Sequence, residues 1–165
     1  MKTLFRVFMM AFVLVGCTID GHEDAPNPDE SDIIKVGDHL PSFSVDILTE
    51  GGAGVFSTER LTGPTVIVFF HTGCSDCQRE LPILNDYYLR HREDQGFQMV
   101  AIAREEGRES IEAFWQAQKL SIPYSPQADR RIFNLFATQT IPRVYICSAE
   151  GIVLWMGVEK FTISE

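Results

Sequence analysis

The sequence predicts an α/β fold in which helices flank a central mixed β-sheet. Two continuous apolar runs, at residues 65–70 and 97–103, are typical of strands covered on both faces. Segments with a helical spacing of apolar residues follow each run. Two later apolar runs flank a short turn and predict an antiparallel hairpin. Strands that alternate with helices and end in a hairpin indicate an α/β sandwich with a mixed sheet.

The folded domain is expected to begin near Ile33 with two short strands. Residues 42–48, SFSVDIL, alternate as a half-buried strand does. A glycine-rich turn at 51–54 then leads to Val55-Phe56. After the central strand, residues 75–92 are expected to form a helix that Pro82 kinks. The expected inward stripe of this helix consists of Leu81, Leu84, Tyr88 and Leu89.

The second half of the domain continues the alternation. Residues 110–120 are expected to form a helix whose aromatic residues belong to the core, and residues 129–137 a short helix. The terminal hairpin is expected to pair residues 143–147 with 152–156. Residues 162–165 resemble a helix N-cap and first turn, after which a final helix is expected to be missing, either because it is lost or because the chain is truncated.

The N-terminus has the features of a bacterial lipoprotein signal. Lys2 and Arg6 precede a short apolar stretch, which is too short to span a membrane and fits a signal peptide at 1–16. Leu14-Val15-Gly16-Cys17 resembles the lipoprotein box, in which Cys17 would carry the lipid; an ordinary secretory signal is the alternative. Residues 17–32, rich in acidic residues, Pro and Gly, are expected to be a flexible tether, which leaves 33–165 as the domain.

Composition limits the classes of partner. The chain has 165 residues, enough for one domain, and a formal net charge of −9. An acidic surface argues against nucleic acid or anionic lipid as the main partner. We find no glycine-rich dinucleotide motif after a strand. The expectation is therefore that the protein uses no nicotinamide, flavin or other cofactor.

The most informative motif is Cys74-Ser75-Asp76-Cys77, which directly follows the central strand and opens a helix. A thiol at a helix N-terminus faces free backbone N–H groups and the positive end of the helix dipole. Both favour the thiolate, the form that attacks disulfides. A second thiol three residues later lies close enough to bond to the first. The motif therefore predicts dithiol–disulfide chemistry.

These motifs together resemble the TlpA/ResA-type thiol–disulfide oxidoreductases of the thioredoxin-like superfamily, over residues 36–161. The opening Val36–Phe43, the pattern Cys74-x-x-Cys77-x-x-Glu80-x-Pro82, and Ile141-Pro142 before the hairpin carry the resemblance. A helix and a short strand between 104 and 128 also fit this type. The resemblance implies a thioredoxin-like fold and a redox-active CxxC disulfide.

The resemblance also implies roles for individual residues. Cys74 would attack the partner disulfide, and Cys77 would resolve the mixed disulfide. Glu80 would relay the proton of the resolving thiol. Pro142, with a cis bond, would place a flat backbone edge beside Cys74 for the partner. The partners would be disulfide-bearing exported proteins, including cytochrome c apoproteins, and a membrane dithiol reductant. The location would be the cell envelope, facing the periplasm, with the outer membrane favoured because Thr18 is not aspartate.

The sequence departs from this family near the thiols. Gly73 stands where the family usually has tryptophan, and Asp76 places a negative charge between the cysteines. That charge should raise the pKa of the attacking thiol and stabilise the disulfide, which predicts a reductase. If Asp76 instead faces water, it only caps the helix. His71 is a candidate for tuning Cys74, with an ordinary strand-end histidine as the alternative.

Two other functions are compatible with the fold. A peroxidase of the peroxiredoxin kind would need Pro and Thr or Ser before its cysteine, and neither Cys74 nor Cys77 has them. A copper chaperone would need a histidine near the late strands, where the sequence has none, and no metal ligands are assigned. Cys147, the remaining cysteine, is expected to be an inert buried thiol, with a second redox role as the alternative.

Overall fold

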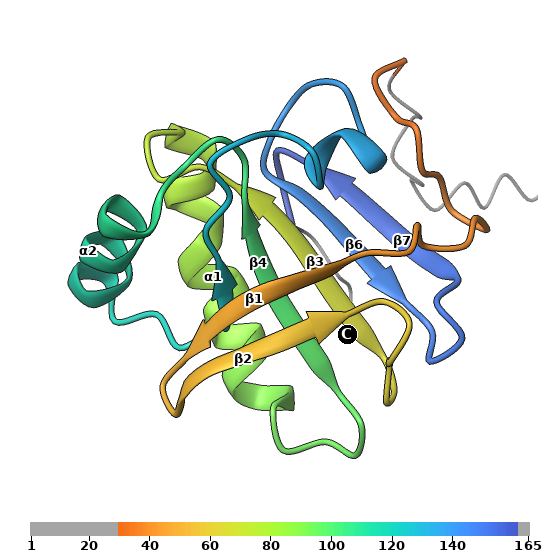
Figure 1. Ribbon diagram of the computed structural model, residues 1–165, viewed down its shortest axis with the longest axis horizontal. Helices are drawn as coiled ribbons and strands as arrows, with labels where there is room; N and C mark the ends of the chain where they lie inside the picture. The colour runs from red at the N-terminus through yellow and green to blue at the C-terminus, as the bar shows by residue number, and fades with distance from the viewer. Residues whose placement is uncertain (1–29, 162–165) are drawn as a thin grey trace, which may run out of the picture.

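A single twisted sheet forms the centre of the computed structural model, which describes residues 30–161. Its seven strands lie in the order β2-β1-β5-β4-β3-β6-β7 (Figure 1). Strands β3 and β4 pair in parallel, whereas β3–β6 and β6–β7 are antiparallel, so the sheet is mixed as predicted. The strand bounds are β1 Ser44–Thr49, β2 Gly52–Ser57, β3 Thr65–Phe70, β4 Gln98–Ala103, β5 Tyr124–Ser125, β6 Arg143–Cys147 and β7 Val153–Val158.

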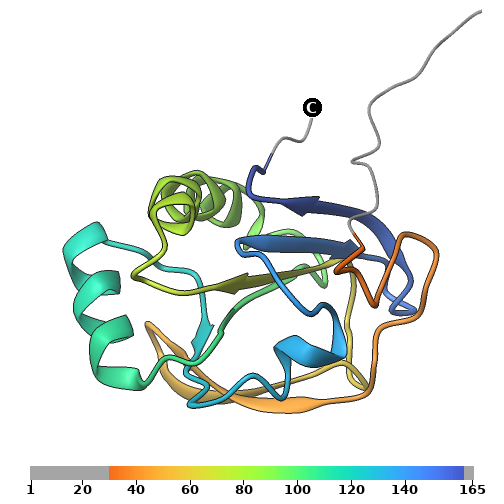
Figure 2. The same ribbon diagram turned by 90° about the horizontal axis from the view of Figure 1, so that it is seen from above.

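Helix α1, Ser75–His91, covers one face of the sheet, and the short 3₁₀ helix η1, Phe133–Leu135, lies on the opposite face (Figure 2). Asp76 in the first turn of α1 and basic residues in its last turn complement the helix dipole. Pro82 lies inside α1, which continues through it. Helix α2, Arg108–Gln118, ends at Lys119, which adopts a left-handed conformation.

The core forms around β3, all six residues of which are buried. Phe70 packs against Trp115 of α2 on one face of the sheet, with 4.9 Å between ring centroids. Phe69 packs against Phe133 and Phe136 on the other face. Successive residues of this buried strand therefore pack against opposite layers of the fold and hold them together.

The helical elements differ from the prediction in two places. The segment predicted as a helix at 129–137 forms only the three-residue η1. Its buried aromatic residues, Phe133 and Phe136, are three residues apart, a spacing that one 3₁₀ turn satisfies. In α1, Leu81 and Leu84 are fully buried as expected, but Leu89 is 41% exposed and does not belong to the inward stripe.

The folded domain begins earlier than the predicted boundary at Ile33. Ser31 and Asp32, expected in the tether, are buried, and Asp32 forms a bridge with Ala137. The side chain of Arg143, fully buried at the start of β6, donates hydrogen bonds to both residues. A buried arginine needs such a partner, and the acidic composition of the segment concealed this role for Asp32.

Several predictions concern residues outside the described range. The signal peptide at 1–16, the lipidation of Cys17 and most of the tether lie before residue 30, and the missing final helix concerns residues 162–165. Within residues 30–161, no helix is both long and apolar enough to cross a membrane.

Candidate active site

Cys74 caps the N-terminus of α1 at the point where β3 ends. Its backbone is extended, and its Sγ accepts a hydrogen bond from the backbone N–H of Cys77 at 3.4 Å. The backbone N–H of Cys74 in turn donates to the carbonyl of His71 at 3.1 Å. The buried strand fixes the start of the loop and the helix fixes its end, so the first sulfur lies at the helix N-terminus that the sequence predicted.

The two thiols differ in environment. Cys74 is partly exposed, whereas Cys77, one turn further along α1, is fully buried, and both are free thiols. Burial raises the pKa of the Cys77 thiol well above its ordinary value, and its interactions with Cys74 act in the same direction. A hydrogen bond with the backbone of His71 and the positive charge of Arg104 oppose this shift of the Cys77 pKa. The pair thus has one accessible sulfur and one that is held protonated.

Pro142 lies beside the dithiol, as the resemblance implied. The Ile141–Pro142 peptide bond is cis. The Sγ of Cys74 lies 3.6 Å from the carbonyl oxygen of Ile141, across a separation of 67 residues. The carbonyl of Pro142 accepts a hydrogen bond from the backbone N–H of Glu159 in β7's C-terminal extension. The loop before β6 therefore borders the first sulfur directly.

Glu80 is buried, but its contacts differ from those expected of a proton relay. One carboxylate oxygen accepts a hydrogen bond from the backbone N–H of Phe161 at 2.9 Å. The other accepts one from Nε of Arg79 at 3.1 Å. Both oxygens therefore have partners other than the thiols, and the side chain ties α1 to the segment that follows β7.

Asp76 forms an ion pair on the helix surface. Its Oδ1 lies 2.8 Å from Nη1 of Arg79, one turn along α1, and its side chain is 39% exposed. Pairing with Asp76 and Glu80 raises the pKa of Arg79. The charge of Asp76 is thus partly offset by a neighbour that the sequence analysis did not consider.

A buried carboxylate supports the loop before Cys74. Glu106, only 6% exposed, accepts hydrogen bonds from the backbone N–H of Thr72 at 2.7 Å and from the Thr72 hydroxyl. Nδ1 of His71 lies 3.8 Å from the same carboxylate and accepts a hydrogen bond from the N–H of Gly73. His71 thus belongs to the loop's hydrogen-bond network. No local pattern distinguishes Glu106 in the sequence, because it stands among several acidic residues.

Arg104 is a second residue that sequence reasoning missed. It directly follows β4, and its backbone N–H donates to the carbonyl of Phe70 at the end of β3. Its charge acts on both Cys74 and Cys77, and burial lowers the pKa of its own guanidinium. The parallel pairing of β3 and β4, which a single sequence does not display, brings this residue next to the dithiol loop.

Cys147 lies apart from this site, at the end of β6. It is fully buried, and burial raises its pKa to about 12. These properties agree with the expected inert thiol. Within residues 30–161, no group of three or more His, Cys, Asp or Glu side chains is arranged to hold a metal ion.

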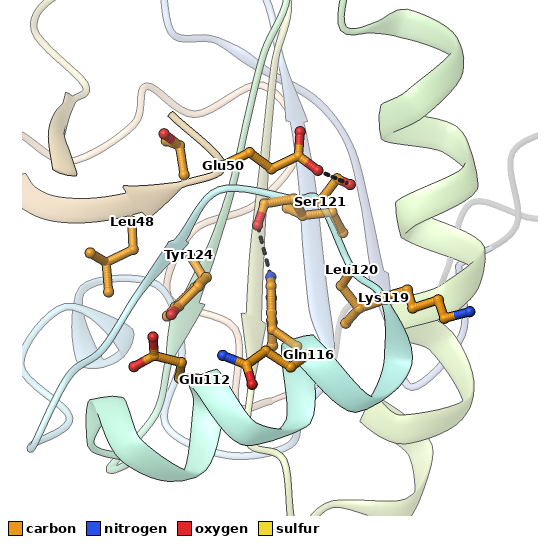
Figure 3. A pocket seen from close by; sticks show the side chains of 11 residues that line it. Leu48, Glu50, Glu112, Gln116, Lys119, Leu120, Ser121 and Tyr124 are labelled. Carbon is orange, nitrogen blue, oxygen red and sulfur yellow. Dashed lines mark hydrogen bonds between the residues drawn. The ribbon is translucent and has the colours of Figure 1, made fainter. Parts of the chain in front are cut away.

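A cavity of about 540 Å³ lies elsewhere, between the end of α2 and the β1–β5 pair (Figure 3). Glu112, Gln116 and Lys119 line its α2 side. Its rim is held by a hydrogen bond from the Ser121 hydroxyl to Glu50 at 2.7 Å. Neither cysteine of the dithiol nor Pro142 lines this cavity, so it is not part of the candidate active site.

The sequence is similar to a known protein family and to thiol-disulfide oxidoreductases. The sequence model of the AhpC/TSA family matches residues 36–156. The thiol-disulfide oxidoreductase ResA of Oceanobacillus iheyensis is 25% identical over 125 residues, which cover 74% of this chain and 65% of that protein.

Solved structures support the same fold. A protein of Bacteroides thetaiotaomicron described as a protein disulfide isomerase superposes with a TM-score of 0.71 at 22% identity, covering 78% of this chain and 82% of that one. A thioredoxin family thiol:disulfide interchange protein of Chlorobium tepidum gives a TM-score of 0.62 at 23% identity, covering 76% and 88%. The predicted thioredoxin-like fold is thereby confirmed.

Proposed function

The chain belongs to the AhpC/TSA family, and we propose that it is a thiol–disulfide oxidoreductase that uses Cys74 and Cys77 to reduce disulfides in exported proteins. The observation that carries this proposal is the asymmetry of the dithiol. The partly exposed Cys74 sulfur accepts the Cys77 N–H at the start of α1, and the Cys77 sulfur is buried behind it. The relative named ResA supports the same class of reaction.

The reaction follows from this asymmetry. The Cys74 thiolate attacks one sulfur of the partner disulfide, which forms a mixed disulfide and releases the other partner sulfur as a thiolate that takes up a proton. Cys77 then loses its proton and attacks the Cys74 sulfur. This step forms the Cys74–Cys77 disulfide and releases the second partner thiol. The partner gains two electrons and two protons, and an external membrane dithiol must reduce the enzyme again.

Cys77 needs a proton acceptor in the second step, because burial raises its pKa. We assign this role to Glu80, which lies one turn further along the same helix and is buried. Each of its oxygens accepts one hydrogen bond, from Phe161 or from Arg79, and keeps a second lone pair that can take up the proton. Glu80→Gln should slow the second step and accumulate mixed disulfide, while the first step keeps its rate.

The border of the site fits a partner in extended conformation. The carbonyl of Ile141 lies next to the Cys74 sulfur, and the cis bond that follows presents a proline without an N–H. An extended partner strand can pair with the backbone before Pro142 while its disulfide meets Cys74. Pro142 is therefore assigned to partner positioning.

The cellular setting is the part of the proposal that rests on sequence. A signal peptide at 1–16 and a lipid on Cys17 would hold the domain at the cell envelope, facing the periplasm. Disulfides form in exported proteins in that compartment, so a reductase has substrates there. Labelling with radioactive palmitate in wild type and in a Cys17→Ser variant tests the anchor separately from the chemistry.

Reduction of a model disulfide protein, such as insulin, tests the proposed reaction. Wild type should catalyse it with dithiothreitol as donor, Cys74→Ser should be inactive, and Cys77→Ser should accumulate a mixed disulfide at Cys74. Cys147→Ser is the matched control and should retain the wild-type rate because Cys147 is buried away from the dithiol. If Cys74→Ser reduced insulin as fast as wild type, the proposal would be wrong.

A further inference from the structure

Arg104 has an unusual environment for a charged side chain. Its Nε is buried and has no hydrogen-bond partner, which holds for no other buried side-chain nitrogen or oxygen in residues 30–161. The guanidinium lies over the ring of Phe133, with Cζ 5.3 Å from the ring centroid. Buried polar groups are normally hydrogen-bonded, so an exception calls for an explanation.

A second guanidinium shares the same aromatic ring. Cζ of Arg130 also lies 5.3 Å from the centroid of Phe133, which is itself 1% exposed. The charge of Arg130 is partly offset by the carboxylate of Glu105 at 3.7 Å, and its guanidinium donates a hydrogen bond to the carbonyl of Thr138 at 2.7 Å. The two like charges repel each other, and burial together with the charge of Arg130 lowers the pKa of Arg104. Two positive charges thus lie over one ring with a single carboxylate nearby.

This guanidinium pair, Arg104 and Arg130 over Phe133, lies at the sheet edge that carries the dithiol. The backbone N–H of Arg104 donates to the carbonyl of Phe70, four residues before Cys74, at 2.8 Å. Phe133 packs edge-on against Phe69, the preceding residue of β3, at 5.5 Å. Because β3 and β4 are parallel, their carboxyl ends lie at the same edge of the sheet. Ligands of α/β proteins commonly bind at this edge.

We propose that the guanidinium pair is an anion subsite that binds a carboxylate side chain of the partner polypeptide next to its disulfide. A partner carboxylate at the guanidinium groups supplies a second counter-charge to two arginines that share the single carboxylate of Glu105. The chain as a whole carries a net charge of −9, so it does not attract acidic partners over a long range. The subsite therefore favours partners with acidic residues only once their disulfide lies at the thiols. The proposal rests on the proposed function.

Three disulfide peptides that differ only in the two residues flanking the disulfide, Glu, Gln or Lys, test the subsite. We expect the reduced wild-type protein to react with the Glu peptide about 10-fold faster than with the Lys peptide, as one charge-assisted contact allows. Arg130→Gln should slow the Glu peptide and leave the Lys peptide unchanged. Arg104→Gln, which also removes a charge that acts on the thiols, should slow the Glu peptide more than the Lys peptide. Arg131→Gln is the matched control, since Arg131 is 84% exposed and pairs with Asp129.

Two results would overturn the subsite. If Arg104→Gln slowed all three peptides equally, its charge would serve the thiols and not the partner. If wild type reduced the Glu and Lys peptides equally well, no acidic selectivity would exist.

A failure of the proposed function is recognised separately, as no reduction of any peptide by wild type. In that case the subsite is tested by peptide binding alone. Each peptide is titrated into a protein that carries Cys74→Ser and Cys77→Ser, and the NMR signal of the Arg104 Nε–H is followed. The Glu peptide should shift this signal and the Lys peptide should not; equal or absent shifts would contradict the subsite.

Discussion

At the scale of single residues, the effect of a charged side chain on the thiols depends on whether another side chain neutralises its charge. Asp76 was expected to act on the thiols through its negative charge, but Arg79 holds it in an ion pair at 2.8 Å. An exposed pair of this kind interacts weakly and is screened by salt. The redox effect of Asp76 is therefore coupled to Arg79, and the two residues are best changed together.

The Asp76–Arg79 pair gives the first prediction. Asp76→Asn should raise the potential of the dithiol by less than about 30 mV, because Arg79 already offsets much of the charge. Arg79→Gln should lower the potential, since it leaves the Asp76 charge uncompensated. Equilibration with glutathione and dithiothreitol measures both shifts. A rise of the potential in Arg79→Gln would contradict this explanation.

Cys147 provides a prediction about pH. Its pKa is raised from 9.0 to about 12 by burial. Below the pKa of Cys147 in the unfolded chain, the thiol is protonated in both states and its contribution to stability is complete. As the pH rises toward the higher pKa of the folded protein, the unfolded chain loses the proton first, and this contribution is lost. Between pH of about 7.5 and about 10.5, wild type should therefore lose about 2 kcal/mol more free energy of unfolding than Cys147→Ala.

Urea denaturation at the two pH values checks this difference. The other buried groups with raised pKa values, Cys77, Tyr124 and Tyr145, are present in both proteins. Of these, Tyr145 interacts with Cys147, but burial is the largest cause of its raised pKa, so the contributions of these groups largely cancel. Equal losses in wild type and Cys147→Ala would show that Cys147 ionises normally in the folded protein.

At the scale of elements, the strand-loop-helix unit of β3 and α1 depends on close packing of the loops at the opposite end of the sheet. Gly96 precedes β4 with a φ of +77°, and a Cβ there would lie 2.3 Å from the carbonyl oxygen of Thr62. Thr62 in turn leads into β3, and its hydroxyl donates to the carbonyl of Gly96 at 3.0 Å. The two parallel strands are thus aligned by a contact that admits no side chain.

Gly96→Ala should therefore destabilise the protein by about 2–4 kcal/mol, through backbone strain and steric overlap. The matched control is Gly107→Ala at the N-cap of α2, where a Cβ meets nothing within 4 Å. This control should change the free energy of unfolding by no more than about 0.5 kcal/mol. Similar losses in the two variants, measured by urea denaturation, would contradict the close approach.

The elements also show how far sequence alone leads. The bounds of β3 at 65–70 and β6 at 143–147 were predicted correctly, because both segments are rich in β-branched and aromatic residues that favour buried strands. The 3₁₀ turn η1 was predicted as a longer helix, since apolar residues three apart suit either element. Cys74 at the helix N-cap follows from local sequence, whereas Arg104 and Glu106 reach the site through strand pairing, which leaves no local pattern.

At the scale of the whole molecule, a buried ion pair joins the N-terminal segment to the active-site border. Nε of Arg143 donates to the carbonyls of Gln139 and Thr140 at 2.9 Å, in the loop that precedes Pro142. Its other guanidinium nitrogens reach Asp32 and Ser31. Arg143 therefore connects the end of the expected tether to the loop beside Cys74.

Loss of this connection should be costly. Asp32→Ala should destabilise the protein by about 3–5 kcal/mol, because it removes a carboxylate that pairs with the buried charge of Arg143. Asp38→Ala is the control from the same segment, since Asp38 accepts an exposed hydrogen bond from the Lys35 N–H. Thermal unfolding of both variants checks the difference. A melting temperature for Asp32→Ala equal to that of Asp38→Ala would show that the pair contributes little.

The central claim is that Cys74 and Cys77 form a redox-active pair, and its most direct test is the equilibrium potential of that pair. The protein is equilibrated in glutathione and dithiothreitol buffers, its remaining thiols are alkylated, and mass spectrometry identifies the cysteines that are linked. We predict a two-electron transition of a Cys74–Cys77 disulfide at about −250 mV or lower, near the value of a reductant like thioredoxin. A potential above about −150 mV would contradict the assignment as a reductase, and the absence of a Cys74–Cys77 disulfide at any potential would contradict the central claim itself.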